Sequence, residues 1–155
     1  IMGYYSQVRY TTTKEGFEKI KKLAKQHYAD IINEKTKDKQ VEERDGSLVV
    51  KEEYLPGKFV STLYSKEMPL DFEVQRLSSD GKYMMFGYDW VKWMGYDHLE
   101  RKSIDWACEH CGELVRCIMV GEDGEHDEET WNNEDDDYNM PYVGFTCSVD
   151  DDAWV

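Results

Sequence analysis

The chain has 155 residues, of which 40% are hydrophobic and 14% aromatic, and its formal net charge is −14. This much apolar material excludes wholesale disorder, and the length fits one domain. The sequence has no run of about 18 apolar residues, which excludes a membrane-spanning helix. It also has no basic-then-apolar amino terminus, so we expect a cytoplasmic protein. The strong negative charge argues against direct nucleic-acid binding over the whole surface.

The negative charge is concentrated in the acidic carboxy-terminal third, 117–155. Arg116 is the last Arg or Lys, and the 13 acidic residues after it account for nearly all of the excess charge. Trp131, Tyr138 and Trp154 lie among these acids, whereas a disordered tail is uniformly polar. Two interpretations stay open: a solvated face, or a charged surface that binds a basic cleft. We expect a single α+β domain over 1–155 that includes this segment.

The first elements are a strand and a long helix. Residues that favour β structure predict a strand over 3–11. Thr12 and Glu15 fit a capping box, which predicts a helix from 13 to about 33. The apolar residues that follow at helical spacing form one predicted stripe: Phe17, Ile20, Ala24, His27 and Ile31.

Two hairpins follow the polar stretch 34–46. Pro56-Gly57 and Ser79-Asp80-Gly81 are turn signals between residues that favour β structure. They predict paired strands at 47–54 with 58–64, and at 71–77 with 82–90.

A second helix is predicted to begin near Asp97 and to bury Ile104, Ala107, Cys108 and Cys111 on one face, with Gly112 just past its end. Strands are expected at 113–120 and 142–149, with a long exposed acidic connection, 121–141, between them. This order predicts an α+β fold, an antiparallel sheet with two helices on one face, as a ferredoxin-like (split βαβ) variant.

The run from Arg116 to Glu129, RCIMVGEDGEHDEE, places Gly-Glu-Asp directly after a predicted strand and then adds further acids. It resembles a strand-plus-acidic-loop signature of small phage and prophage proteins of ferredoxin-like α+β type. The resemblance implies a mobile-element origin and an anti-CRISPR or other anti-defence role. It supplies no catalytic residues.

Metal chemistry is the alternative. Cys108 and Cys111 have the spacing of a zinc knuckle, and the Glu122–Asp127 loop offers carboxylate ligands. The simpler interpretation is that both cysteines pack on the buried face of a helix. The alternative function is therefore a small metal-binding domain or metal-dependent enzyme. We predict no catalytic residues, no metal and no cofactor.

We therefore expect a non-catalytic acidic binding protein that inhibits a host nucleic-acid-binding defence enzyme, as an anti-CRISPR protein or DNA mimic does. Its partner is a basic host protein, with carboxylates replacing phosphates against Lys and Arg. The predicted partner-binding residues are Glu122, Asp123, Glu125, Asp127, Glu128, Glu129, Trp131, Glu134, Asp135, Asp136, Asp137, Tyr138, Asp150, Asp151, Asp152 and Trp154.

Overall fold

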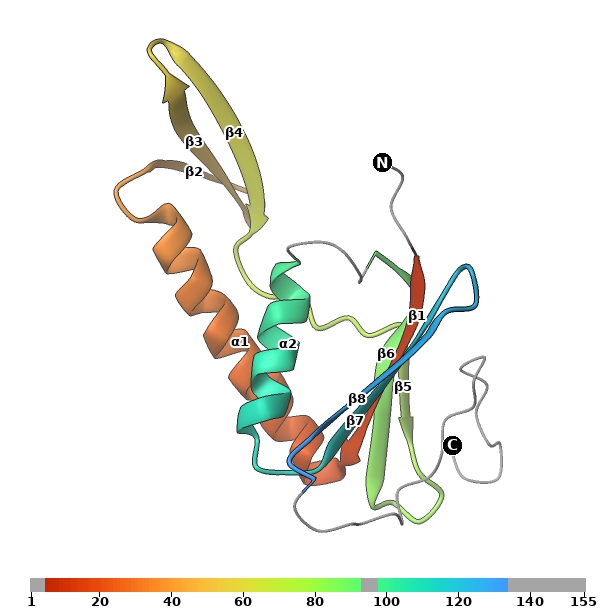
Figure 1. The fold of residues 1–155 in the computed structure, drawn as a ribbon. Helices are drawn as coiled ribbons and strands as arrows, with labels where there is room; N and C mark the ends of the chain where they lie inside the picture. The colour runs from red at the N-terminus through yellow and green to blue at the C-terminus, as the bar shows by residue number, and fades with distance from the viewer. Residues whose placement is uncertain (1–4, 93–97, 134–155) are drawn as a thin grey trace.

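A computed structural model describes residues 5–92 and 98–133 (Figure 1). The elements in chain order are β1 (Ser6–Thr13), α1 (Lys14–Thr36), β2 (Gln40–Arg44), β3 (Ser47–Leu55), β4 (Lys58–Ser65), β5 (Val74–Leu77), β6 (Tyr83–Val91), α2 (Leu99–His110), β7 (Val115–Gly121) and β8 (His126–Trp131). The predicted strand 142–149 lies outside the described residues. Neither described helix combines the length and the apolar composition that a membrane span requires.

The fold is mixed α+β, with two helices and antiparallel strand pairing. A five-stranded sheet has the order β5-β6-β1-β7-β8, and a separate three-stranded sheet has the order β2-β3-β4. Both helices cover one face of the larger sheet, and the smaller sheet lies beyond the end of α1 (Figure 1). The prediction of a single sheet was therefore wrong: the hairpin at 47–64 pairs with β2 instead of joining the main sheet.

The main core lies between the helices and the five-stranded sheet. Tyr10 and Phe86 stack at 5.2 Å between ring centroids, and Phe17 of α1 packs on Phe86 at 4.8 Å. Ile104 and Cys108 of α2 complete this cluster, and both are fully buried. Burial of each large apolar side chain contributes about 1.5–3 kcal/mol, so this layer holds the helices against the sheet.

The start of α1 differs from the capping-box prediction by one residue. Thr13 is the N-cap, and its hydroxyl accepts a hydrogen bond from the Gly16 amide at 2.9 Å. Thr12 belongs to β1, and its buried hydroxyl donates to the Leu114 carbonyl at 2.9 Å. The strand continues to Thr13 because this contact keeps Thr12 in the sheet.

The buried stripe of α1 also differs from the prediction in its second half. It runs through Phe17, Ile20 and Ala24 as expected, and then through Tyr28 and Ile32 instead of His27 and Ile31. In a helix of 3.6 residues per turn, each step of four residues rotates the stripe by about 40°, so the buried stripe winds around α1 toward its end. The Tyr28 hydroxyl donates to the Ser65 carbonyl at 2.7 Å and so ties α1 to the end of β4.

The buried face of α2 is confirmed. Ile104, Ala107 and Cys108 are fully buried, and Cys111 is nearly so. Gly112 follows the helix with a φ of 76°, which glycine adopts without steric cost. The predicted helix end and its buried cysteine face are therefore both present.

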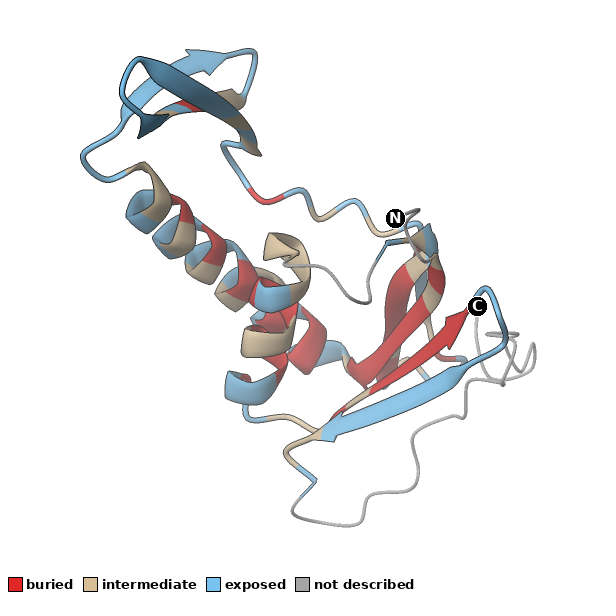
Figure 2. Ribbon diagram, turned by 45° about the horizontal axis from the view of Figure 1, so that its top comes forward, coloured by how far each residue is buried: buried red, intermediate tan, exposed pale blue. Residues whose placement is uncertain are grey.

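Two strands fall where the sequence predicted polar connections. β2 lies within the predicted polar stretch 34–46, and β8 lies within the predicted acidic connection 121–141. Every residue of β2 is exposed, as are five of the six residues of β8 (Figure 2). Both strands are sheet edges, and their exposed polar residues lack the apolar alternation of a half-buried strand.

Candidate functional site

The pairing of β8 with β7 determines toward which face of the sheet each acidic side chain of β8 points. Glu129 pairs with Cys117 and Asp127 with Met119, and both β7 residues belong to the core beneath the helices. Glu128 pairs with Ile118, which belongs to a cluster on the other face. Because successive side chains of a strand alternate between faces, Asp127 and Glu129 face α2, and Glu128 faces away.

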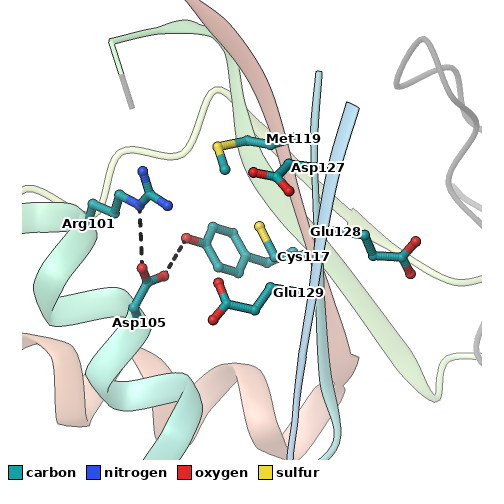
Figure 3. A pocket seen from close by; sticks show the side chains of 8 residues that line it. Arg101, Asp105, Cys117, Met119, Asp127, Glu128 and Glu129 are labelled. Atoms are coloured by element: carbon teal, nitrogen blue, oxygen red, sulfur yellow. Dashed lines mark hydrogen bonds and ion pairs between the residues drawn. The ribbon is translucent and has the colours of Figure 1, made fainter. Parts of the chain in front are cut away.

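A pocket of about 170 Å³ lies between α2 and the β7–β8 hairpin. Sites for drug-sized ligands occupy about 300–1,000 Å³, so this pocket fits the head group of one side chain. Figure 3 shows the Asp127 and Glu129 carboxylates on the same side as Asp105, while Glu128 points away. The lining residues are Tyr10, Arg101, Asp105, Cys117, Met119, Asp127, Glu128 and Glu129.

Asp105 is held at the wall of this pocket by two partners. The Tyr10 hydroxyl donates to Asp105 Oδ1 at 3.0 Å, and Arg101 Nε lies 3.4 Å from Asp105 Oδ2. Arg101 and Asp105 are four residues apart on α2, the spacing that brings side chains together on one helix face. Tyr10 rises from the central strand β1, so the carboxylate is fixed from both the helix and the sheet.

The pKa values of the pocket carboxyls indicate that burial disfavours their ionised forms. Burial raises the pKa of Asp105, although the Tyr10 hydrogen bond and the Arg101 charge oppose this effect. Burial also raises the pKa of Glu129, and the nearby charge of Asp105 raises it further. The ionised forms of both carboxyls are therefore disfavoured, and perturbed pKa values of this kind are common at functional sites.

Three other acids of the hairpin have local partners. Glu128 lies 3.7 Å from Arg116 Nε on the opposite face of the sheet. Glu122 Oε1 accepts from the Tyr5 amide at 3.3 Å, and Asp123 Oδ1 accepts from the Glu125 amide at 3.0 Å. All of these acids are nevertheless exposed, so their charge reaches the solvent.

The Trp131 ring is not fully exposed at the surface. It is half-buried, packs against the main core and stacks with Tyr10 at 6.2 Å between ring centroids. The next residue, Asn132, donates its side-chain amide to the Cys108 carbonyl at 2.8 Å and to the Glu113 carbonyl at 2.9 Å. These bonds fix the end of β8 to the end of α2.

The two parts of the predicted metal site lie apart. Cys108 and Cys111 are at the end of α2, before β7 begins, whereas the Glu122–Asp127 loop follows the end of β7. A seven-residue strand spans roughly 20 Å at 3.3–3.4 Å per residue, so the two groups do not share one ion. Within residues 5–92 and 98–133, no three His, Cys, Asp or Glu side chains form a cluster that could hold a metal.

The structure brings together six of the predicted partner-binding acids on one hairpin: Glu122, Asp123, Glu125, Asp127, Glu128 and Glu129. The remaining predicted residues lie outside the described residues: Glu134, Asp135, Asp136, Asp137, Tyr138, Asp150, Asp151, Asp152 and Trp154. Sequence reasoning missed Tyr10, Arg101 and Asp105. The Arg101–Asp105 spacing was a signal, but only the sheet register shows that this pair faces β8.

The chain was compared with known proteins at three levels. No protein-family model, curated protein or solved structure matches it. The arguments for its function therefore depend on the geometry and charge of the acidic hairpin.

Proposed function

We propose that the protein is a non-catalytic binding protein whose acidic β7–β8 hairpin occupies a basic, nucleic-acid-binding surface of another protein. The observation that carries this proposal is the pocket in which Asp127 and Glu129 face the partly buried Asp105. Arrangements of this kind present negative charge to the Lys and Arg side chains that otherwise bind phosphates.

The raised pKa values of two pocket carboxyls support a positively charged partner. Asp105 and Glu129 both have raised pKa values, so their ionised forms are disfavoured in the isolated protein. A positive side chain placed between them offsets this cost of burial, because opposite charges at close range favour the ionised carboxylates. Binding energy at this site therefore grows with the positive charge of the partner.

The size and shape of the pocket support a single Lys or Arg head group as its occupant. A volume of about 170 Å³ is too small for a nucleotide-sized ligand. Arg101 already pairs with Asp105, and an incoming guanidinium finds Asp127 and Glu129 on the opposite wall. Arginine presents five donors in a planar fork and suits such a carboxylate pair better than lysine does.

The charge density along β8 supports phosphate mimicry over a longer surface. Three consecutive acids, Asp127 to Glu129, follow a strand that rises about 3.4 Å per residue. One strand of duplex DNA also carries one phosphate charge per 3.4 Å of helix axis. The alternation of side chains divides the acids of β8 between two faces, so a groove that surrounds the edge contacts more of them than a flat surface.

The proposal includes a ferredoxin-like core. Four of the five strands, β5-β6-β1-β7, have the order and antiparallel pairing of two interleaved βαβ units. In this interpretation, β2–β4 form an insertion between α1 and β5, and β8 is added at one edge. The proposed protein is a phage-encoded, cytoplasmic inhibitor of a host defence enzyme, such as an anti-CRISPR protein, as the resemblance of the run from Arg116 to Glu129 implies.

A capture experiment with matched baits tests the proposal. The parent, an acidic-strand variant (Asp127→Asn, Glu128→Gln and Glu129→Gln) and a control variant (Glu42→Gln, Glu43→Gln and Asp45→Asn) are immobilised. Each variant loses three acidic charges from an exposed edge. Proteins captured from a bacterial lysate are identified by mass spectrometry, and each purified partner is then tested for displacement of bound DNA or RNA.

The expected result is a basic nucleic-acid-binding protein that the parent and the control variant capture and the acidic-strand variant loses. We also expect the parent to displace bound DNA or RNA from that protein. If the acidic-strand variant captures the same proteins as the parent, or if the captured partner keeps its nucleic acid bound, the proposal is wrong.

A further inference from the structure

The three-stranded sheet carries most of the exposed apolar surface of the described residues. Six of the seven large hydrophobic side chains that are exposed in residues 5–92 and 98–133 belong to its strands: Val41, Tyr54, Leu55, Phe59, Val60 and Leu63. Figure 2 shows most of this sheet as exposed, apart from a buried and half-buried stretch that includes Val50 of β3. Apolar surface gathered in this way marks an interaction site rather than ordinary scatter.

The four outer strands of the two described sheets differ in how they are protected from pairing. β5 has only four residues, and β8 carries three consecutive acids. β2 has three charged residues among its five. By contrast, β4 has eight residues and a single charge, Lys58, at its first position. Short length and charge keep an edge from pairing with another chain, and β4 has neither.

We propose that β4 pairs antiparallel with β4 of a second copy of this chain, so that two three-stranded sheets join into one of six strands. Such a pairing is symmetric about a two-fold axis, which is the commonest arrangement of protein dimers. The inference does not depend on the acidic hairpin, which lies in the other sheet.

The sequence of β4 is complementary to itself in the register that places Ser61 opposite Ser61 of the second copy. Phe59 then lies opposite the second copy's Leu63, and the symmetry repeats this pair on the other side of the axis. Phe59, Ser61 and Leu63 share one face of the strand. Phe59 is 51% exposed and Leu63 is 68% exposed, so both gain cover from the pairing, and aromatic–aliphatic pairs stabilise antiparallel strands.

The charge of this part of the chain favours a second copy over a strongly charged partner. From Lys39 to Lys66 there are five basic and five acidic residues, whereas the whole chain has a net charge of −14. Two copies that meet at β4 therefore bring neutral surfaces together. A meeting at β8 would oppose two rows of acids, and like charges opposite each other destabilise strand pairs.

The β4 edge is already held in place in the single chain. The Tyr28 hydroxyl donates to the Ser65 carbonyl at 2.7 Å, and the Lys66 amide donates to the Gly46 carbonyl at 2.9 Å. The sheet projects beyond the end of α1 in both views (Figure 1, Figure 2). Pairing at β4 therefore orders little additional chain, and less ordering favours association.

Sedimentation equilibrium over a range of protein concentrations tests the association. The parent, Leu63→Lys and Leu55→Lys are compared, because both leucines are exposed and both variants replace an apolar side chain with a positive charge. Leu55 lies at the tip of the β3–β4 hairpin, outside the proposed pairing. We expect the parent and Leu55→Lys to dimerise, and Leu63→Lys to raise the dimer dissociation constant at least tenfold. A parent that stays monomeric at every concentration, or equal behaviour of the two variants, overturns the proposal.

Cysteine cross-linking tests the register. Directly opposite residues of an antiparallel pair have Cα atoms about 4.5–5.5 Å apart, within the range that a disulfide spans. Ser61→Cys therefore cross-links two copies when oxidised glutathione accepts the two electrons of the thiol pair. Thr62→Cys is the matched control, because its counterpart lies two residues away along the second strand. A non-reducing gel of both variants and the parent reports the result: equal cross-linking of the two variants, or none in Ser61→Cys, overturns the register.

Discussion

Glu129 lies directly across the β7–β8 ladder from Cys117, whose side chain is buried beneath the two helices. This pairing turns the Glu129 carboxylate toward α2, where Asp105 occupies the opposite wall of the pocket. The next residue back, Glu128, is turned by the same alternation toward Arg116 on the other face. One residue of strand register therefore decides whether an acid enters the pocket or faces away from it.

The raised pKa of Glu129 gives a pH-dependent stability with a defined sign. Because its folded pKa lies above the ordinary value of 4.5, the folded protein binds this proton more tightly than the unfolded chain. Its contribution to the free energy of unfolding is therefore present below about pH 4.5 and is lost as the pH rises through the folded pKa. We expect Glu129→Gln to raise the melting temperature at pH 7, and the difference from the parent to disappear toward pH 4.

Glu42 provides a control of opposite sign for that measurement. A hydrogen bond from Arg44 lowers the pKa of Glu42, so its contribution is present above about pH 4.5 and is lost as the pH falls through the folded pKa. Glu42→Gln is expected to lower the melting temperature slightly at pH 7, because exposed pairs contribute little. If the two variants shift the melting temperature in the same direction at pH 7, the environment of Glu129 in the pocket is not as described.

Gly87 tests the close contact between β1 and β6. A Cβ built on Gly87 would lie 1.9 Å from the Val8 carbonyl oxygen, and the φ of Gly87 is 157°. Because that oxygen belongs to the backbone, the strands must separate to admit a methyl group. We expect Gly87→Ala to lower the free energy of unfolding by about 3 kcal/mol or more, measured by urea denaturation.

Gly81→Ala is the matched substitution for Gly87→Ala. Gly81 has a φ of 75° with open space around its Cβ position, so only the backbone conformation opposes alanine there. The expected loss is about 1–2 kcal/mol. Equal losses at the two glycines would contradict the close approach of β1 to β6.

Asn132 tests the link between β8 and α2. Its amide donates to the Cys108 and Glu113 carbonyls, and its φ of 58° lies in the left-handed region. We expect Asn132→Gly to lower the free energy of unfolding by about 2 kcal/mol, because it loses two hydrogen bonds but keeps this backbone conformation. Asn132→Ala is expected to lose about 1 kcal/mol more. A glycine variant as stable as the parent in thermal melts would show that the two bonds do not stabilise the fold.

The thiols of the described core are predicted to be unreactive in the folded protein. Burial raises the pKa of both Cys108 and Cys117 well above the ordinary value of 9.0, and the thiolate is the reactive form. We expect iodoacetamide to label both cysteines at least about a hundredfold more slowly in the native protein than in denaturant. Mass spectrometry of tryptic peptides measures each site separately. Fast labelling of Cys108 in buffer would contradict the buried face of α2.

The sequence predicted those elements that carry a strong local signal. The helix α1 and the β3–β4 hairpin were predicted to within three residues at each end, because an apolar stripe and a Pro-Gly turn mark them. β2 and β8 were missed because they are exposed edges: a strand with charged residues on both faces has the same composition as a loop. Pairing with β3 and β7 makes them strands, and that pairing is a long-range property.

The candidate site was predictable only in part for the same reason. The acids of 122–129 stand out in composition, and the sequence analysis named six of them as partner-binding residues. Which of them meet Asp105 depends on the register of β8 on β7 and on the placement of α2 over the sheet. Trp131 illustrates the limit most clearly: its position among acids predicted a surface anchor, whereas its ring packs on Tyr10.

The salt dependence of binding tests the central proposal most directly. The affinity of the parent, the acidic-strand variant and the Glu42, Glu43 and Asp45 control variant for the captured partner is measured by isothermal titration calorimetry from 50 to 500 mM NaCl. Several charge pairs that form together make the affinity of the parent fall steeply with salt.

We predict that the acidic-strand variant binds at least about tenfold more weakly at low salt, equivalent to about 1.4 kcal/mol, and with a shallower salt dependence. The control variant is predicted to follow the parent. Equal affinities of the parent and the acidic-strand variant at both low and high salt would contradict the proposal and leave the acidic hairpin as a solvated face.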